Sequence, residues 1–324
     1  MVRYFKRREV TLLVILAVLL ALITLRAPGF LRVNNLNDVL NDTSILVIVS
    51  IGQMLVIVTG GADLSVASGI ALTGMTVAML NWFHPGIPIA LIVLLSVAIG
   101  LALGAVNGSL VALGGIPPII TTLATLGIYR GLVFLESGGQ WVSASKMSET
   151  FRDLPHYTPL GVTNLLAAAV IVAMAAAVFL RLTRAGREIY GVGGNITAAR
   201  FVGINLKRIT FLVYVLCGAL TGLSGLLWVA RYASAQNDTA TGFELQTIAA
   251  CVIGGASLVG GSGTVLGVVL GAIFLGIVNN ALPMIDLSPF YQMAIQGFVI
   301  LVAIVANTVV DRRNQAAMLR TRKL

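Results

Sequence analysis

The chain has 324 residues, of which 58% are hydrophobic and only 10% are charged. A soluble domain carries roughly 25% charged residues, so the composition excludes an ordinary soluble enzyme or binding domain and indicates a membrane protein. The net charge of +9 does not indicate a nucleic-acid partner, because the basic residues gather at three places between or beyond apolar runs.

Ten apolar runs are expected to cross the bilayer as helices. Most are near or somewhat short of the roughly 20 residues that a crossing needs. The first run follows four basic residues without a convincing cleavage site, so we expect a retained helix rather than a signal peptide. The sequence therefore predicts an all-α, polytopic bundle of about ten transmembrane helices, forming a single domain over 1–324. The expected spans are 10–25, 44–59, 66–80, 87–113, 117–135, 163–182, 209–231, 243–253, 264–282 and 290–310.

The distribution of Lys and Arg predicts the orientation of the chain in the membrane. Of the 21 Lys and Arg residues, 15 fall in three segments: the N-terminus, residues 181–208 and the C-terminal tail. Ten spans place all three segments on one side, and cytoplasmic loops carry an excess of basic residues. We therefore expect both termini and the 183–208 segment to be cytoplasmic.

The central basic segment, residues 183–208, is the only long polar stretch in the second half of the chain. Asn195 is typical of a helix N-cap and Gly203 of the residue after a C-cap, which predicts a helix of about two turns between them. Such a short helix is unstable alone in water, and the small residues Ala198 and Ala199 would allow a partner to approach closely. Two interpretations stay open: a docking surface, or an ordinary basic cytoplasmic loop.

Glycine is frequent, with 35 residues, and many recur at four-residue intervals. This spacing puts them on one helix face, where two helices can approach closely. We expect packing rather than chemistry from these positions. They are Gly100, Gly104 and Gly108, then Gly218 and Gly222, and then Gly263, Gly267 and Gly271.

Two glycine-rich stretches resemble each other: GGADLSVASG at 60–69 and GGASLVGGSG at 254–263, which match at six of ten positions. The match indicates either an internal repeat, which transporters often contain, or chance in a glycine-rich chain. Helix breaks within a membrane are tolerated only where protein or water covers the backbone. We expect both stretches beside a pathway or at its cytoplasmic mouth.

Few polar side chains interrupt the apolar runs. Asp63 is the acid nearest to the membrane interior, where charges are by default functional, but it is also placed to cap the helix expected from residue 66. Uncharged polar groups in the spans either hydrogen-bond a neighbouring helix or contact a neutral solute. The candidates for a pathway or gate are Gln53, Gly60, Gly61, Asp63, Ser65, Asn107, Thr121, Thr125, Gly254, Gly255 and Asn279.

The sequence argues against several kinds of chemistry. Cys217 and Cys251 lie in apolar runs without metal-ligand spacing and are expected to be small core residues, and the two His residues are isolated, so no metal site is expected. There is no GxxxxGK[ST] phosphate loop, so the chain does not bind ATP by that route. Transport would draw its energy from an ion gradient or from a partner.

Five stretches carry a resemblance to a known family: VTGGADLSVASG (58–69), ATLGIYRGL (124–132), AGREIYGVGGNITAARFVGI (185–204), IAACVIGGASLVGGSGTVLGVVLGA (248–272) and SPFYQMAIQGFVILVAI (288–304). The chain resembles the inner-membrane permease subunits of bacterial sugar ABC importers, the group of ribose, xylose, rhamnose and autoinducer-2 permeases. Residues 127–142 and 237–255 look most like the autoinducer-2 and rhamnose branch, with ribose behind.

The resemblance implies a fold like that of type II ABC importers and a set of partners. These are cytoplasmic ATPase subunits that bind the ATP, a second permease chain (identical or a sister), an extracytoplasmic sugar-binding protein and the lipid bilayer of the inner membrane. It implies no cofactor on this chain. The central basic segment would couple to the ATPase through Arg187, Glu188, Gly193, Gly194, Asn195, Ala198, Ala199, Arg200 and Gly203.

Two other classes of function remain as alternatives. An ion-coupled secondary transporter of a small neutral solute would usually place acids or histidines in mid-span, which this chain lacks. An intramembrane enzyme would need paired acids, a Ser/His pair or metal ligands, and none of these patterns is present in the sequence. The identity of the sugar is not determined by the sequence.

Overall fold

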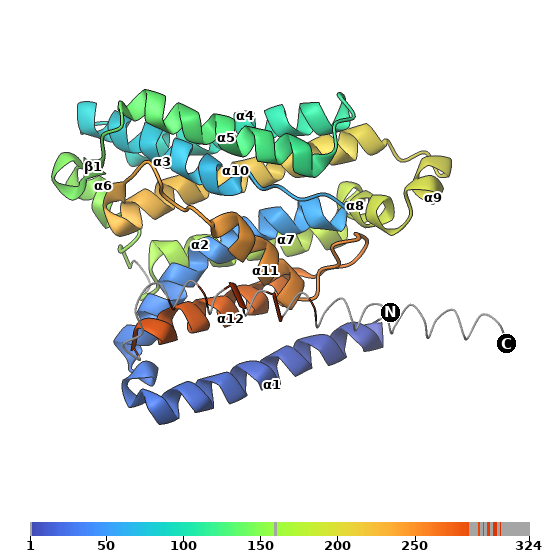
Figure 1. Cartoon of the computed structure of the whole chain (residues 1–324), viewed down its shortest axis with the longest axis horizontal. Helices are drawn as coiled ribbons and strands as arrows, with labels where there is room; N and C mark the ends of the chain where they lie inside the picture. The colour runs from blue at the N-terminus through green and yellow to red at the C-terminus, as the bar shows by residue number, and fades with distance from the viewer. Residues whose placement is uncertain are drawn as a thin grey trace.

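The computed structural model describes residues 2–158 and 161–284, together with positions 291, 294, 297, 298, 301, 302 and 305. In this part of the chain the long helices run side by side in a bundle, with two very short strands at one end (Figure 1). The elements in chain order are α1 (Val2–Arg26), η1 (Pro28–Leu31), α2 (Val33–Val58), α3 (Val66–Phe83), α4 (Ile89–Ala112), α5 (Pro118–Ser137), β1 (Val142–Ser143), η2 (Ala144–Lys146), α6 (Glu149–Asp153), α7 (Asn164–Leu182), α8 (Arg184–Gly194), α9 (Ile196–Phe201), α10 (Leu206–Tyr232), β2 (Ser234–Ala235), α11 (Phe243–Ile253) and α12 (Val265–Met284).

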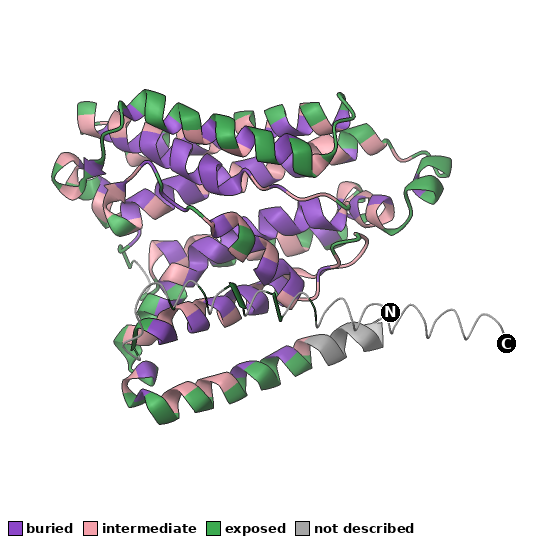
Figure 2. Ribbon diagram, in the orientation of Figure 1, coloured by how far each residue is buried: buried purple, intermediate pink, exposed green. Residues whose placement is uncertain are grey.

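Helix α2 is the centre of the bundle. Every residue from Thr43 to Val58 is buried, and the helix contacts α7, α10, α11 and α12. Helices α1, α4, α5 and α7 are also strongly apolar but few of their residues are buried, so Figure 2 shows purple along α2 and much green and pink on the periphery. A helix that is apolar all round belongs in a core or in lipid, and this bundle shows both cases.

Glycine brings α4 and α10 together until their backbones touch. Gly100 and Gly104 of α4 lie against Gly218 and Gly222 of α10. A Cβ atom at Gly104 would collide with the carbonyl oxygen of Tyr214 and lie 3.0 Å from the Cα of Gly218. The predicted close packing at these glycines is confirmed.

Helix α12 packs against the end of α11 through glycines in the same way. Gly267 faces Gly254, and a Cβ at Gly271 would lie 2.8 Å from the Gly254 nitrogen and collide with the Ala250 carbonyl oxygen. The two cysteines fill small spaces nearby, because both are buried and the Cys251 thiol donates to the Ser50 carbonyl oxygen at 3.2 Å. Their predicted role as core residues is confirmed.

The expected spans agree with the helices that the structure describes. Eight of the described helices are long and apolar enough to cross a membrane. The expected span at 243–253 is helix α11, with the predicted bounds. At 11 residues it is about 16 Å long, too short to cross alone. The tenth expected span, 290–310, lies outside the described residues except for seven isolated positions.

Helix α2 begins eleven residues earlier than the expected span at 44–59, at Val33. The added turns are polar, and they pair with the end of α10: Arg231 contacts Asp38 at 3.2 Å and Asp42 at 3.1 Å. The apolar run therefore marks the buried part of the helix but not its start.

One end of the bundle carries α8 and α9, and the other carries the two short strands (Figure 1). We call these the α8–α9 end and the strand end. Helix α1 begins at the α8–α9 end, because Thr264, just before α12, donates to the Glu9 carboxylate at 3.1 Å. At the strand end, β1 and β2 pair antiparallel, with Val142 opposite Ala235.

The α4–α10 contact should make the stability of the protein sensitive to any side chain added at its glycines. Gly104→Ala should lower the thermal unfolding midpoint of the detergent-solubilised protein, because the new Cβ forces two backbones apart at a cost of about 1–3 kcal/mol. Gly127→Ala on α5 is the matched control, since nothing lies within 4 Å of its Cβ position. Equal midpoints for the two variants would contradict the described packing.

Candidate functional site

The central basic segment contains the capped helix that its sequence predicts. In α9 the Asn195 side chain accepts a hydrogen bond from the Ala198 N–H at 2.9 Å. Gly203 follows the C-cap Val202 with φ of 82°, the left-handed conformation that glycine adopts most readily. Both predicted caps are confirmed.

A second helix, α8, precedes α9 and was not predicted. Its N-cap is Thr183, whose hydroxyl accepts from the Gly186 N–H at 3.0 Å. Ile189 and Val192 are buried on one face, which packs against α2, α7 and α10. Glycines within α8 weakened the sequence signal, because glycine disfavours an isolated helix. Tertiary packing on the bundle compensates for this.

Helix α9 has one buried and one exposed side, and this corrects one expectation. Ala199 is buried at 3% exposure against its own chain, so the prediction that it lies on a docking face is wrong. Phe201 and Val202 are 87% and 75% exposed, and Ala198 is exposed beside them. A helix this short buries only one side, and its register was not evident without the bundle.

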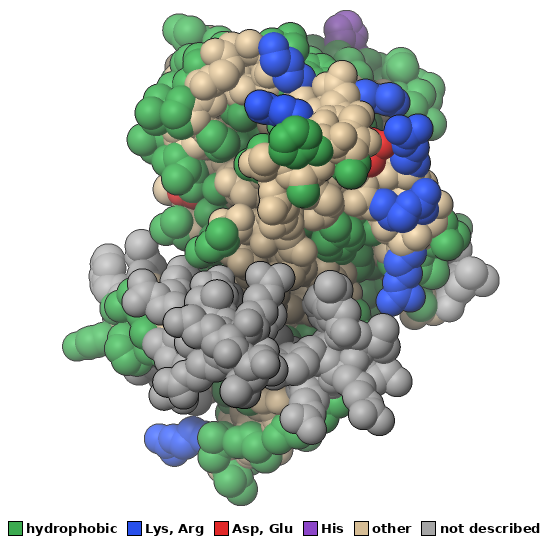
Figure 3. Space-filling view, turned by 90° about the vertical axis from the view of Figure 1, so that its right-hand side faces the viewer, with side chains coloured by type: hydrophobic (Ala, Val, Ile, Leu, Met, Phe, Trp, Pro, Cys, Tyr) green, Lys and Arg blue, Asp and Glu red, His purple; other side chains and the backbone are tan. Residues whose placement is uncertain are grey.

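The exposed apolar side chains of α9 lie among basic residues. Arg184, Arg187 and Arg200 are exposed, and Arg184 forms an ion pair with Glu188 four residues later, at 2.6 Å. Figure 3, which views the α8–α9 end, shows Lys and Arg side chains around exposed hydrophobic ones. We call this surface, formed by Ile196, Phe201, Val202, Arg184, Arg187 and Arg200, the α9 surface.

Beneath the α9 surface, three backbones meet at what we call the glycine junction: the end of α2, the end of α8 and the loop 254–263. The Gly261 N–H donates to the Val58 carbonyl oxygen at 2.9 Å. A Cβ at Gly193 of α8 would collide with that same oxygen and lie 2.5 Å from the Gly261 nitrogen. Only glycine allows this approach. A Cβ at Gly260 would lie 3.1 Å from the Gly193 oxygen and from the Gly60 nitrogen.

Tyr190 of α8 adds a side-chain contact to the junction. Its hydroxyl donates to the Gly263 carbonyl oxygen at 2.8 Å. Burial raises the pKa of the Tyr190 phenol, while Arg181 acts in the opposite direction. The phenol therefore stays protonated and remains a donor at physiological pH.

Four of the pathway candidates form a buried hydrogen-bond network at the turn between α2 and α3. The Asp63 carboxylate accepts from the Ser65 N–H at 2.9 Å and from its hydroxyl at 2.7 Å. The Asn107 amide of α4 donates to the Ser65 hydroxyl oxygen at 2.8 Å. With its amide oriented to satisfy its partners, Gln53 bonds the backbone N–H and carbonyl oxygen of Asp63, both at 3.2 Å. These groups fix the turn between α2 and α3.

The remaining candidates are spread over three places. Gly60, Gly61, Gly254 and Gly255 lie at or beside the glycine junction, and Thr121 and Thr125 lie on α5. The Thr125 hydroxyl donates to the backbone of its own helix, to the Thr121 carbonyl oxygen at 3.1 Å. Asn279 lies at the strand end, where it lines a cleft. The two glycine-rich stretches come together, since a Cβ at Gly260 would lie 3.1 Å from the Gly60 nitrogen, while their expected place beside a pathway stays a prediction.

Sequence reasoning missed Val58, Tyr190 and Gly261, which make the closest contacts of the junction. Val58 contributes only a carbonyl oxygen, which no sequence pattern marks. The signal for Gly261 was present in the glycines of 254–263, because a loop that passes another backbone closely needs glycine.

The chain is similar to a family of known transport proteins. A family model described as the permease component of a branched-chain amino acid transport system matches residues 35–304. The chain belongs to this permease family. No solved structure matches the chain.

Three relatives of this permease are themselves transport proteins, and their similarity to it covers nearly the whole length of each chain. The ribose import permease protein RbsC of Escherichia coli K12 is 40% identical over 97% of both chains. The autoinducer 2 import system permease protein LsrC of Enterobacter sp. strain 638 is 33% identical over 97% of this chain and 90% of its own. A probable ABC transporter permease of Sinorhizobium fredii is 33% identical over 92% of this chain and 88% of its own.

These comparisons confirm the family resemblance and do not favour the ion-coupled alternative. They differ from the sequence expectation in one respect. We expected ribose to stand behind the autoinducer-2 and rhamnose branch, whereas the ribose permease is the more similar of the two named relatives.

The glycine junction makes a testable prediction. Gly193→Ala should push α8 away from Val58 and increase deuterium uptake of the peptide containing the Gly261 amide in hydrogen-exchange mass spectrometry, by about tenfold in rate. Gly194→Ala is the matched control, because its Cβ position is open. Unchanged exchange in Gly193→Ala would show that α8 is not packed on α2 as described.

Proposed function

We propose that the chain is the membrane-spanning permease subunit of an ATP-binding cassette importer that moves a monosaccharide or related small sugar across the bacterial inner membrane. The ribose import permease and the autoinducer 2 import permease among its relatives support sugar import. The structural observation that carries the proposal is the α9 surface. It is connected to the central helix α2 through α8, whose Gly193 packs against the Val58 carbonyl oxygen in the glycine junction. ATP binds to a separate subunit, and this chain needs no cofactor of its own.

The ATPase subunit docks on the α9 surface. Phe201 and Val202 are large, apolar and almost fully exposed, and an isolated patch of this kind outside the membrane marks a protein interface. The surrounding arginines favour a partner groove with acidic groups at its rim. Apolar anchors at the centre with charges around them are the usual arrangement of an interface.

A movement of α9 caused by docking is transmitted to α2 through close backbone contacts. Helix α8 contacts the Val58 end of α2 through Gly193, and the loop 254–263 bonds the same carbonyl oxygen. Packed backbones shift as units rather than deform. Closure of the ATPase subunits would therefore move α2, α11 and α12 together and open the pathway to the other side.

The other partners are a second permease chain, identical or a sister, and an extracytoplasmic sugar-binding protein that delivers the substrate. The chain is a multi-pass protein with both termini in the cytoplasm. The basic α8–α9 end supports this orientation, and Glu9 near the start of α1 lies at the same end.

The orientation is tested with reporters. A reporter active only outside the cytoplasm should be silent when fused after Leu324. It should be active when inserted after Gly139, which is exposed at the strand end and has open space around it. The opposite pattern of activity would rule out the proposed topology.

Docking is tested with Phe201→Asp. The new carboxylate places a charge at the centre of an apolar contact, so co-purification of the ATPase subunit should fall by about tenfold or more, and sugar uptake with it. Membrane insertion should be unchanged because the residue lies outside the spanning helices.

Trp141→Asp is the control for that experiment. Trp141 is 57% exposed and lies at the strand end, so the same kind of change should leave ATPase binding intact. Normal ATPase binding and uptake in Phe201→Asp would show that the central basic segment serves topology alone.

A further inference from the structure

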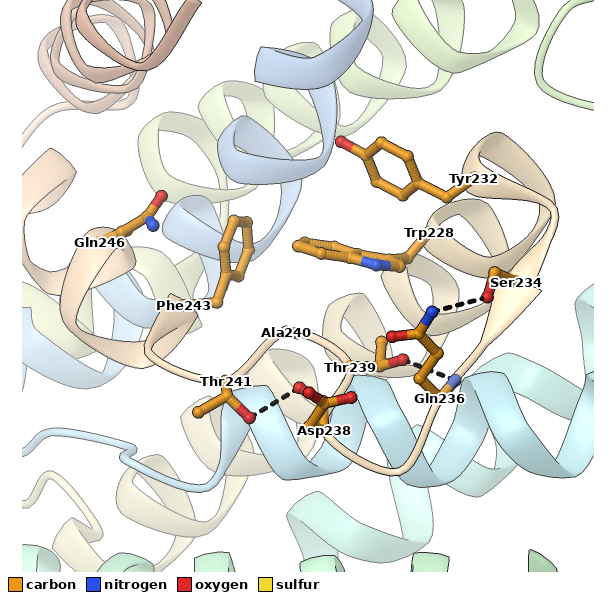
Figure 4. A pocket seen from close by; sticks show the side chains of 10 residues that line it. All are labelled: Trp228, Tyr232, Ser234, Gln236, Asp238, Thr239, Ala240, Thr241, Phe243 and Gln246. Carbon is orange, nitrogen blue, oxygen red and sulfur yellow. Dashed lines mark hydrogen bonds between the residues drawn. The ribbon is translucent and has the colours of Figure 1, made fainter. Parts of the chain in front are cut away.

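A cleft opens at the strand end of the bundle, far from the α9 surface. It consists of two adjoining hollows of about 450 and 330 Å³ that share Trp228, Tyr232, Phe243 and Gln246. Figure 4 shows the first hollow, with the rings of Trp228, Tyr232 and Phe243 on one side of the loop that follows α10. Small-molecule sites commonly measure on the order of 300–1,000 Å³, so each hollow has the capacity for one small solute.

The aromatic rings form one wall of the cleft, where Tyr232 is 47% exposed and Trp228 partly exposed, while Phe243 is buried at 7% exposure. Trp228 packs edge-on to Phe243, with 5.0 Å between ring centroids, and lies 5.4 Å from Tyr232. Since each ring supports the next, the wall is rigid and apolar. The C–H face of a sugar ring stacks favourably on such a wall, whereas its hydroxyl groups need polar partners elsewhere.

Those polar partners are present on α2, α11 and α12. Gln246 and Asn279 line the cleft and share one hydrogen bond, from the Asn279 amide to the Gln246 carbonyl oxygen at 3.2 Å. Two further polar atoms of the lining, the Thr43 hydroxyl and the Asn280 carbonyl oxygen, are buried and have no hydrogen-bond partner in the described structure. A buried polar atom without a partner is costly, so a solute hydroxyl or a water that reached either atom would be stabilised.

The charges of the cleft disfavour an anionic ligand. No Lys or Arg is among the described residues that line either hollow, while Asp42 and Asp238 line one each. The Arg231 guanidinium is already paired with Asp38 and Asp42. A phosphate or carboxylate would meet repulsion without a counter-charge.

The loop that forms one side of the cleft is held in a demanding conformation. Ala240 has a φ of 59° and Gly242 a φ of 83°, and a positive φ at alanine persists only where the surroundings impose it. Arg130 of α5 imposes it here, because its guanidinium donates to the carbonyl oxygens of Asn237 at 2.7 Å and Thr239 at 3.0 Å. The loop is preorganised rather than free to collapse into the cleft.

We propose that this cleft is a low-affinity binding site for a neutral monosaccharide, with Trp228 and Tyr232 as the stacking wall, supported by Phe243, and Gln246, Asn279 and Asn280 as hydroxyl partners. The inference rests on the proposed function, because it names the place where the imported sugar first contacts the permease. An open cleft with few polar anchors binds weakly, as transfer onward requires.

The site is tested by tryptophan fluorescence of the full chain in lipid nanodiscs. The protein has three tryptophans, so Trp82→Phe and Trp141→Phe together leave Trp228 as the only reporter. Saturable changes in emission are expected with at least one of D-ribose, L-rhamnose, D-xylose and D-galactose at concentrations up to about 100 mM. Ribose 5-phosphate should bind at least about tenfold more weakly than ribose.

Asn279→Leu should raise the half-saturation concentration about threefold to tenfold, the effect of one lost hydrogen bond. Gln140→Leu makes a comparable change at an exposed residue of the strand end outside the cleft, and should have no effect. Absence of any saturable response, equal binding of ribose 5-phosphate, or equal effects of Asn279→Leu and Gln140→Leu would each overturn the proposal.

A separate measurement distinguishes this inference from the proposed function. Co-purification of the ATPase subunit and sugar uptake do not depend on the fluorescence reporter. If both are present while Trp228 does not respond to sugar, the cleft proposal fails and the permease assignment stands. If neither is present in the wild-type chain, the proposed function itself is wrong.

Discussion

The carbonyl oxygen of Val58 is the point on which the arrangement of the α8–α9 end depends. It is one of the last backbone acceptors of α2, and such groups need partners outside the helix. Gly261 supplies its N–H, and Gly193 leaves the space that a side chain would fill. Because the contact joins backbones, no side-chain rotation can relax it. A displacement of α8 must therefore move α2 or break the hydrogen bond.

The features predicted correctly from sequence are those set by local chemistry. Asn195 and Gly203 bound α9 because each satisfies the helix end next to it, and the glycines of α4 and α10 mark a contact face by their spacing. The bounds of α11 follow from an apolar run that ends in glycines. In each case the signal lies within a few residues of the structure that it specifies.

The features that were missed depend on partners distant in sequence. Helix α8 has a weak helical pattern and is stabilised by α2, α7 and α10, which lie outside its own stretch. The buried side of α9 was likewise not predictable, since Ala198 and Ala199 are chemically identical and only the bundle distinguishes them. The glycine junction was foreseen only as two stretches sharing a location, and the contribution of a Val58 backbone atom has no sequence signature.

The sequence alone likewise does not reveal which uncharged amides line a pathway. Asn107 and Asn279 both interrupt apolar helices, and nothing in their immediate neighbours distinguishes them. In the structure Asn107 is buried at 1% exposure and bonds the Ser65 hydroxyl, whereas Asn279 is partly exposed, lines the cleft and bonds Gln246. What separates a structural amide from one able to contact a solute is whether the fold leaves it accessible.

The two ends of the molecule are connected by the same elements. Helix α2 carries Thr43 in the cleft and Val58 in the glycine junction, about 22 Å apart along a buried helix. Gln246 and Asn279 lie on α11 and α12, and the loop 254–263 that joins these helices bonds Val58. Helices α2, α11 and α12, which contribute to the walls of the cleft, thus each have one end at the glycine junction. A shift imposed there reaches the cleft through rigid helices, without a chain of side-chain rearrangements.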